Sequence, residues 1–396
     1  MSYQKFHATR LFTGTELLEA GNVLITDETG KVETIINIKD AGENIQQFDG
    51  VLTPGFINCH CHLELSHMKG LIPEQTGLVD FVFKVVTQRH FPEDEIADAI
   101  MKAEAEMITN GIVAVGDICN NLSTLPQKLK ERIAYYNFIE VSGWLPSVAE
   151  IRFERSLAFY RDFEKIKNSK YKTQNSLSPH APYSVSNELW QLLSPCFENK
   201  TVTIHNQETN FEDTLFEKGE GDFTRMYEMM KLDTSFFKPT GKSSLRSYFS
   251  KMRSAKNILL VHNTFTKEED VSFVSRESST VSQNAFYCLC VNANQYIENA
   301  LPPVDMFRKR ACDIVLGTDS LASNWRLSIL DEIKTITKNF PSVPLNELLQ
   351  WATLNGARAL QMENELGSFE TGKSPGIVLI EGKGIIDQSS SVRRIL

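Results

Sequence analysis

The stretch INCHCHLELSH, from residue 57 to residue 67, concentrates side chains that can bind a metal ion. Imidazole nitrogens and thiolate sulfurs are both common ligands of zinc. On an extended strand alternate side chains point to opposite faces, so His60 and His62 are expected to share one face. Cys59 and Cys61 are then expected to share the other face and to pack outward against helices as small apolar residues. We therefore predict that the histidines bind the metal.

A zinc site built on the cysteines is the alternative interpretation of the same stretch. Zinc-binding cysteine pairs are usually separated by two or more residues, and that spacing is absent here. A site that used all four alternating side chains would also have to fold the strand back on itself. The spacing therefore favours the histidines over the thiols.

Other residues that bind metals fall where predicted strands end. Strand-like runs end near His60 (VLTPGFINCH), Asp117 (GIVAVGD), Glu140 (IAYYNFIE), His180 (NSLSPH), His205 (TVTIH), His262 (NILLVH), Cys290 (NAFYCLC) and Asp319 (CDIVLGTD). One histidine at a strand end is ordinarily a hydrogen-bonded structural residue. Six such positions, the five histidines 60, 62, 180, 205 and 262 together with Asp319, instead indicate one site, because the loops after parallel barrel strands converge.

Two shorter patterns add candidates for proton transfer and substrate contact. Glu208 lies three residues after His205, where a carboxylate could move protons beside a metal; a solvated glutamate is the alternative. Asp319 ends a strand and is followed by Ser320, a candidate for substrate contact. An aspartate in that place can also serve as a helix cap. Each pattern is weak when taken alone.

The elements that must position these residues alternate between strands and helices. Residues 93–110 carry apolar side chains at helical spacing, and Gly111 follows as a C-cap. Strand–helix alternation on this scale predicts parallel βαβ units, and eight of them need about 250 residues. We predict an α/β fold whose catalytic barrel spans residues 51–364. Residues 1–50 and 365–396 are strand-like and are expected to form a small separate domain, and residues 206–256 are a candidate lid over the site.

Composition and charge restrict the class of protein. The 396 residues carry a net charge of −9, which argues against a polyanion-binding surface and so against nucleic acid as a partner. The first residues lack the apolar core of a signal peptide, and no apolar run reaches the roughly 18 residues of a membrane helix. Seven scattered cysteines, an odd number, indicate reduced thiols. These features predict a cytoplasmic protein without a membrane segment.

Taken in order, several motifs resemble the amidohydrolase superfamily. They are TPGFINCHCH, SPHAPYS, TIHNQE, LVHNTF, LGTDSLASN and ATLNGARAL, followed by GSFETGKSPGIVLI. Within the superfamily they are similar to the aminohydrolase branch of cytosine, guanine and adenosine-type deaminases and chlorohydrolases. The resemblance spans nearly the whole chain and implies a distorted (β/α)8 TIM barrel, flanked by a small β-sandwich that both termini build. Ser374–Pro375–Gly376 replaces the Ala-Asp that relatives commonly have, which concerns the small domain.

The resemblance also implies roles for individual residues. His60, His62, His205 and Asp319 match the ligands of one divalent metal ion, for which zinc is expected and iron or manganese are alternatives. The dinuclear relatives use a carboxylated lysine on the fourth strand, and NSLSPHAPYS offers none, so one metal is favoured. The resemblance further implies that Asp319 also accepts the proton of the attacking water, Glu208 shuttles protons, His262 orients the water or steadies the intermediate, and His180 contacts the substrate.

The implied reaction is hydrolytic deamination of an aminated heterocycle, with ammonia as a product. HCHLELSHMKG resembles the aminodeoxyfutalosine deaminases, which act on an adenine-type 6-amino group, and Glu64 within it is a candidate for hydrogen bonding to a sugar or ring. The residues that could stack on a heterocycle are Phe81, Trp144, Tyr183 and Trp325, although such aromatics are more often core packing. The alternatives are hydrolysis of a cyclic amide, as in imidazolonepropionase-like relatives, a chlorohydrolase-type substrate, and a scaffold that has lost its metal. A homodimer is the family expectation.

Overall fold

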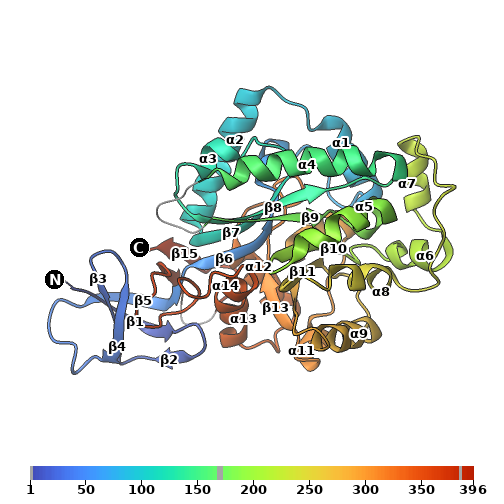
Figure 1. Cartoon of the computed structure of the whole chain (residues 1–396). Helices are drawn as coiled ribbons and strands as arrows, with labels where there is room; N and C mark the ends of the chain where they lie inside the picture. The colour runs from blue at the N-terminus through green and yellow to red at the C-terminus, as the bar shows by residue number, and fades with distance from the viewer. Residues whose placement is uncertain (1–2, 167–172, 383–385) are drawn as a thin grey trace.

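Eight parallel strands form the centre of the molecule in the computed structural model, which describes residues 3–166, 173–382 and 386–396 (Figure 1). They are β6 (Phe56–Cys61), β7 (Ile112–Cys119), β8 (Ala134–Val141), β9 (Gln174–Pro179), β10 (Thr201–Asn206), β11 (Asn257–His262), β12 (Asn284–Leu289) and β13 (Asp313–Leu316). Hydrogen bonds join them into two four-stranded parallel sheets, β6 to β9 and β10 to β13. Each strand coincides with one of the eight runs expected from the sequence.

The two sheets meet along two seams, and residues expected to bind the metal make the hydrogen bonds that close them. At the β9–β10 seam the backbone N–H of His205 donates to the carbonyl of His180 (2.9 Å). At the β13–β6 seam Thr318 and Asp319 both donate to the carbonyl of His60 (3.0 Å each). The ladders thus run along the strands within each half, with register shifts only between β6 and β7, and between the halves these bonds lie at the carboxyl ends. The predicted distorted barrel is confirmed.

Helices surround the barrel on its outer face (Figure 1). The longer ones are α1 (Leu78–Gln88), α2 (Glu93–Thr109), α4 (Ala149–Glu164), α9 (Glu268–Ser279), α10 (Val291–Glu298), α12 (Ile329–Asn339) and α13 (Leu345–Ala352). Shorter ones are α3 (Leu125–Lys128), α5 (Asn187–Leu193), α11 (Val304–Lys309) and α14 (Leu354–Ala359). Helix α2 ends where the sequence indicates, because Gly111 adopts a φ of +78° that a residue with a Cβ rarely tolerates. No helix in the described part of the chain is long and apolar enough to cross a membrane.

Two apolar clusters lie on either side of the barrel wall. The outer cluster packs strand residues such as Phe56, Ile112 and Leu260 against the helices. The inner cluster fills the barrel with residues from six of the eight strands, including Ile57, Phe138, Leu259, Val261, Phe286 and Val315, and α14 contributes Ala357 and Ala359. The barrel is therefore a packed core, and chemistry is confined to its carboxyl end.

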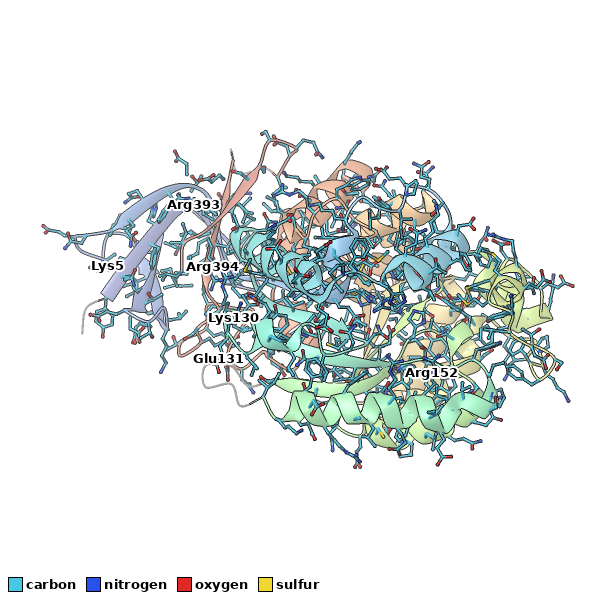
Figure 2. The ribbon with its side chains drawn as sticks, turned by 90° about the horizontal axis from the view of Figure 1, so that it is seen from above. Lys5, Lys130, Glu131, Arg152, Arg393 and Arg394 are labelled. Atoms are coloured by element: carbon cyan, nitrogen blue, oxygen red, sulfur yellow. The ribbon has the colours of Figure 1, made fainter. Side chains whose placement is uncertain are left out.

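Both chain ends build one small β domain. Its strands are β1 (Tyr3–Phe12), β2 (Leu17–Glu19), β3 (Asn22–Asp27), β4 (Val32–Asn37), β5 (Gln46–Pro54), β14 (Ile377–Glu381) and β15 (Ser391–Arg394), which pair into one seven-stranded sheet. Strand β14 pairs antiparallel with both β5 and β15, which joins the two termini. Figure 2 shows labelled Lys5 and Arg393 on this domain, away from Arg152 on α4. Strand β5 runs to Pro54, past the boundary predicted after residue 50.

The long segment between β10 and β11 carries three short helices beside the carboxyl end of the barrel. They are α6 (Phe211–Lys218), α7 (Phe223–Met229) and α8 (Ser244–Tyr248). Their apolar side chains join residues of the other βα loops in a third cluster, which we call the cover cluster and which includes Leu65, Phe81, Trp144, Tyr183, Phe216, Phe223 and Tyr227. Arg225 on α7 also bonds Asp80 on α1 (2.9 Å). The segment is thus packed onto the barrel rim; its opening as a lid stays a prediction.

Candidate metal centre

A β-bulge in β6 directs the first two histidines into the site. The pairing of β6 with β7 advances from Asn58 to Cys61 while the partner advances only from Val115 to Asp117, so β6 contains one extra residue. The bulge changes the expected alternation. Cys59 lies in the inner cluster with Ile57, whereas Cys61 lies in the outer cluster.

The prediction that both cysteines share an outward face is therefore wrong for Cys59. Strict alternation holds only for a strand without a bulge, and the sequence does not mark this one. Burial raises the pKa of both thiols well above the usual value. A protonated thiol is a poor metal ligand. The structure accordingly supports the histidines, rather than the cysteines, as the functional residues of the opening motif.

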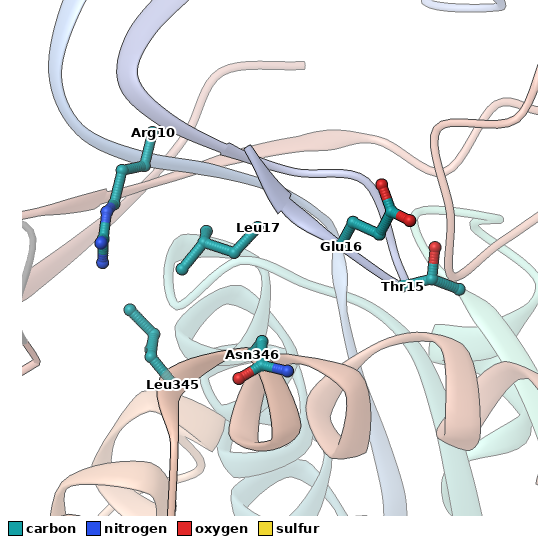
Figure 3. A pocket seen from close by; sticks show the side chains of 6 residues that line it. All are labelled: Arg10, Thr15, Glu16, Leu17, Leu345 and Asn346. Carbon is teal, nitrogen blue, oxygen red and sulfur yellow. The ribbon is translucent and has the colours of Figure 1, made fainter. Parts of the chain in front are cut away.

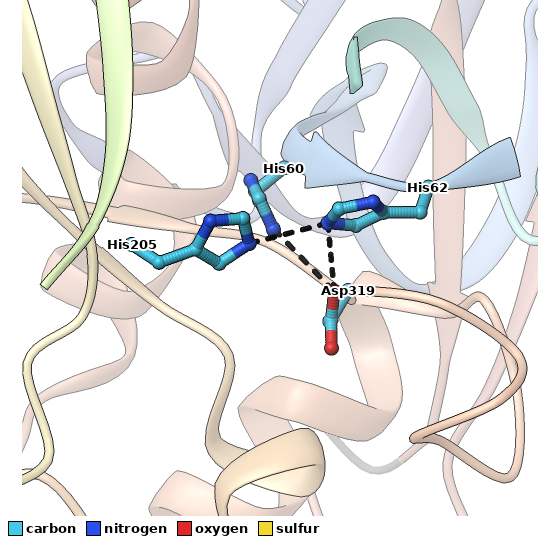
Figure 4. A group of neighbouring side chains, drawn as sticks. All are labelled: His60, His62, His205 and Asp319. Atoms are coloured by element: carbon cyan, nitrogen blue, oxygen red, sulfur yellow. Dashed lines mark hydrogen bonds and ion pairs between the residues drawn. The ribbon is translucent and has the colours of Figure 1, made fainter. Parts of the chain in front are cut away.

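Four side chains from three separate strand ends converge at one point (Figure 4). The Nε2 atoms of His62 and His205 are 3.2 Å apart, and the Nε2 atoms of His60 and His62 each lie 3.4 Å from Oδ1 of Asp319. One ligand atom from each of the four residues lies within 4.8 Å of the others. All four side chains are buried. Positions separated by more than 250 residues in the chain thus form a single cluster.

This donor set fits a divalent metal ion. Nδ1 of His60 is buried without a hydrogen-bond partner among the described residues, and its Nε2 has only the long 3.4 Å contact with Asp319, an expensive arrangement unless something else binds them. Nδ1 of His205 faces the carbonyl of His180 (2.7 Å), which can only accept, so Nδ1 carries the proton and Nε2 presents a lone pair to the cluster. Three imidazoles and a carboxylate suit zinc, iron or manganese.

The protonation states also suit metal binding. Burial lowers the pKa of His62 to about 3 and holds that of His205 well below the usual value, so both rings are neutral near pH 7. Burial opposes ionisation of Asp319, but its hydrogen bond with His60 and the neighbouring imidazoles prevail and hold its pKa well below the usual value. Neutral imidazoles beside an ionised carboxylate are the forms that bind a cation.

The loop after β13 holds Asp319 in position. Ser323 donates to Oδ2 of Asp319 (2.5 Å), and the hydroxyls of Ser320 and Ser323 are 3.0 Å apart. Asp319 itself has a φ of +56°, a conformation that aspartate tolerates better than most residues and that is common at functional sites. Ser320 thus supports the ligand through Ser323; its contact with substrate stays a prediction.

Glu208 and His262 form a second pair beside the metal ligands. Oε1 of Glu208 is 3.6 Å from Nε2 of His262, and both side chains are buried. Asn294 donates to the carbonyl of His262 (3.4 Å), which orients its amide so that Oδ1 accepts from Nδ1 of His262 (2.8 Å). His262 Nε2 is therefore an unprotonated acceptor that faces Glu208.

Both groups of the pair are shifted toward their neutral forms. Burial and the negative charge of Asp319 raise the pKa of Glu208 well above the usual value, and burial lowers that of His262 to about 4. The setting thus favours a proton on the carboxyl of Glu208, next to a basic nitrogen of His262. A carboxyl group kept protonated at neutral pH can act as a general acid.

The residues predicted to contact the substrate differ in the protein contacts that they make. His180 hydrogen-bonds Ser184 through Nδ1 (2.7 Å), and its ring lies beside His205 at a centroid distance of 4.8 Å. Trp144 stacks on Tyr227 at 5.1 Å and an interplanar angle of 7° inside the cover cluster. Phe81 and Tyr183 belong to the same cluster, and Trp325 is 44% exposed and bonds Glu74. Stacking on a heterocycle stays a prediction for all four aromatics.

Glu64 is fully engaged by the protein. Arg89 donates to its Oε1 (2.7 Å) and the backbone N–H of Asn120 donates to its Oε2 (2.9 Å). Burial raises its pKa above the usual value, although Arg89 opposes that shift. Glu64 thus connects the segment after β6 to the loop after β7. Its contact with substrate stays a prediction.

The sequence interpretation assigned no role to two buried acids at strand ends. Asp117 on β7 accepts from the backbone N–H of Leu63 (2.9 Å) and pairs with Lys128 (2.5 Å), which ties the turn after His62 to the barrel wall. Glu140 on β8 lies in a group with His180 and His205 whose polar atoms fall within 4.8 Å of one another. Both could have been found by the same strand-end criterion that selected the histidines.

An open depression of about 480 Å³ lies elsewhere, where the small β domain meets α13 (Figure 3). Arg10, Thr15, Glu16, Leu17, Leu345 and Asn346 line it. It contains no histidine or cysteine and no residue of the metal centre. The polar, buried and mutually facing groups therefore lie at the barrel end, which is the candidate functional site.

Known proteins share both the sequence pattern and the fold. An adenosine deaminase from Helicobacter pylori is 26% identical over 331 residues, which cover 82% of this chain and 77% of that protein. The crystal structure of Helicobacter pylori aminofutalosine deaminase with methylthio-coformycin superposes with a TM-score of 0.74 at 24% identity, covering 96% of this chain and 92% of that one. An adenosine deaminase from Xanthomonas campestris with bound zinc gives a TM-score of 0.69 at 18% identity, covering 96% and 84%. The amidohydrolase family model matches residues 51–393, so this chain belongs to the amidohydrolase family.

Proposed function

We propose that this protein is a metal-dependent hydrolytic deaminase that releases ammonia from an adenine-type nucleoside. The observation that carries the proposal is the buried Glu208, in contact with His262 beside the three-histidine and one-aspartate set, because deamination needs a proton donor for a ring nitrogen next to a site that activates water. The names of the relatives from Helicobacter pylori and Xanthomonas campestris support the substrate class.

The metal set supplies the electrophilic part of the reaction. Residues 60, 62, 205 and 319 would hold one divalent ion, for which we propose zinc, the ion bound in the Xanthomonas campestris protein. When bound, such an ion acts as a Lewis acid that lowers the pKa of a coordinated water molecule.

The chain's own residues move the protons. Asp319 is the ionised base of the site and would take the proton of the attacking water. Glu208 would deliver its proton to the ring nitrogen next to the carbon that carries the amine. Asp319 would pass the proton it took from the water to the amine, which leaves as ammonia, and the hydroxyl of the intermediate would return a proton to Glu208 as the carbonyl forms. His262, held by Asn294 with its Nε2 facing Glu208, would orient that carboxyl group and steady the intermediate. His180, whose ring lies beside that of His205, would contact the heterocyclic ring of the substrate.

The test is a screen for ammonia release by the zinc-loaded protein. Adenosine, 5′-deoxyadenosine, 5′-methylthioadenosine and 6-amino-6-deoxyfutalosine form the first panel, and free adenine, cytosine and guanine form the second. We expect turnover in the first panel, with the inosine-type product detected by absorbance. Hydrolysis of a cyclic amide without ammonia release, or inactivity toward both panels, would overturn the proposal. Light scattering on the same preparation tests the expected homodimer.

A further inference from the structure

We propose that Glu140 recognises the sugar of the substrate by accepting a hydrogen bond from a ribose hydroxyl. This inference rests on the proposed function, since it specifies how the same site selects a nucleoside over a free base. It assigns a specificity-determining role to a residue on β8, a strand that contributes no metal ligand.

Glu140 presents an unsatisfied acceptor to the site. The residue is 8% exposed, and its Oε2 is buried without a hydrogen-bond partner among the described residues. A carboxylate oxygen, a ring nitrogen of His180 and one of His205 lie within 4.8 Å of each other, so the carboxyl group faces the metal centre. A buried polar atom without a partner destabilises the protein, and a ligand that binds to it removes that cost.

Glu64 provides the contrast. Both of its oxygens already accept hydrogen bonds, from Arg89 and from the backbone of Asn120. Of these two neighbouring carboxyl groups, Glu140 is therefore the one with an oxygen left for a ligand. The bonds of Glu64 hold Arg89 and the backbone of Asn120 in place next to Glu140.

The position of Glu140 determines which part of the substrate reaches it. In the strand order β8, β9, β10 and β11, Glu140 lies on one flank of His205 and the Glu208–His262 pair lies on the other. The ring nitrogen that receives a proton must face Glu208. The portion of the substrate remote from that nitrogen then extends toward Glu140.

Hydrogen-bond chemistry selects the hydroxyl. Burial raises the pKa of Glu140 to about 7, so above that pH its ionised carboxylate can only accept and needs a donor. The ring nitrogens N1, N3 and N7 of an adenine nucleoside carry no hydrogen, and its amine is the reacting group. The donors that remain are the sugar hydroxyls, and a free base has none of them.

The experiment compares the binding of adenosine, 2′-deoxyadenosine, 3′-deoxyadenosine and adenine to zinc-loaded protein by calorimetry. A Glu208→Gln background keeps the nucleosides from being consumed. With Glu140 intact, we expect adenosine to bind roughly 10- to 100-fold more tightly than at least one of the deoxynucleosides, the range for a hydrogen bond to a charged group. With Glu140→Ala, that preference should fall to within about threefold, and Glu140→Gln should retain an intermediate preference because the amide oxygen still accepts.

Glu104→Gln is the matched control. Glu104 is a buried carboxyl that bonds Gln127 and Tyr135 outside the barrel wall, so its substitution should leave the adenosine preference unchanged. Zinc content and thermal unfolding of the Glu140→Gln variant show that the fold and the metal site are retained.

The outcomes separate the two proposals. If Glu140→Ala and Glu140→Gln weaken adenosine and both deoxynucleosides equally, or if the preference persists in Glu140→Ala, the role of Glu140 is overturned. If adenosine binds no better than adenine with Glu140 intact, the role is also overturned. If the predicted binding pattern holds but the protein with Glu208 releases no ammonia, the proposed function fails while the recognition role of Glu140 stands.

Discussion

At the scale of single residues, protonation states distinguish this centre from an ordinary cluster of buried polar groups. Burial keeps the imidazoles of His62, His180 and His262 neutral and favours the protonated form of Glu208. Desolvation disfavours charged forms, but the imidazoles around Asp319 hold its pKa well below the usual value. The site thus combines neutral imidazoles, an ionised carboxylate and a carboxyl group that tends to hold its proton.

Replacement of Glu208 by glutamine removes the acid without removing a metal ligand. We expect turnover to fall by about 10²–10⁴-fold, the usual contribution of general acid–base catalysis, while zinc content stays at the wild-type value. Steady-state ammonia release and metal analysis of the same preparation measure both. Wild-type turnover in the Glu208→Gln variant would contradict the role assigned to this carboxyl.

Metal content distinguishes the histidines of the opening motif from its cysteines. Because neither thiol lies in the cluster of candidate ligand atoms, the double variant Cys59→Ala/Cys61→Ala should retain one zinc per chain. His60→Ala should lose most of it, since His60 offers a ring nitrogen that no described residue binds. Elemental analysis after dialysis against trace zinc measures the zinc content of both variants. Zinc loss from the cysteine variant, with unfolding unchanged, would favour the thiol site instead.

At the scale of elements, a buried ion pair holds the turn that follows the first two histidines. Lys128 bonds Asp117 (2.5 Å) and Asn137 (2.7 Å), and the other oxygen of Asp117 accepts from the N–H of Leu63. Burial alone would lower the pKa of Lys128, but Asp117 prevails and holds it above the usual value. The pair connects α3, β7 and the turn next to His62.

Removal of one partner of this pair should lower the free energy of unfolding more than removal of both partners. Lys128→Met leaves the charge of Asp117 buried and unpaired, for which we expect a loss of about 3–5 kcal/mol in the free energy of unfolding. Adding Asp117→Asn should restore part of that loss. Thermal unfolding of the two single variants and the double variant forms the cycle. Strictly additive losses would show that the two residues do not act as a pair.

At the scale of the whole molecule, buried carboxyl groups and buried histidines give stability opposite dependences on pH. Burial raises the pKa of Glu212 and of Glu332 to about 8. Their stabilising contribution is complete below the ordinary value of 4.5 and is lost as pH rises toward 8. Burial lowers the pKa of His180 and of His262 to about 4, so their contribution is present above 6.5 and is lost as pH falls toward 4.

Between about pH 4.5 and 6.5 the two dependences oppose each other, whereas below this window the loss from the histidines dominates and above it the loss from the carboxyl groups dominates. We therefore expect the metal-free protein to be most stable within that window. Thermal unfolding in the presence of a chelator, from pH 4 to pH 9, measures the profile. Glu332→Gln should flatten the alkaline side, because its carboxyl no longer ionises on unfolding. A midpoint that rises steadily to pH 8 would contradict the expected profile.

The sequence alone was sufficient for the elements and for the four residues that cluster as candidate metal ligands. The eight strands, helix α2 and the small β domain follow from local periodicity, turn residues and caps, which act over a few neighbouring residues. His60, His62, His205 and Asp319 could be singled out because parallel strands bring their carboxyl ends together whatever the loops between them do.

Only the tertiary structure decided which way particular side chains face and which atoms remain free. The bulge in β6 separates Cys59 from Cys61, and a register shift depends on pairing with β7 rather than on the local sequence. Glu64 and Glu140 have the same side chain, yet one has both oxygens bonded and the other does not, because Arg89 and the backbone of Asn120 reach only the first. Such differences arise from long-range packing, which no local pattern in the chain encodes.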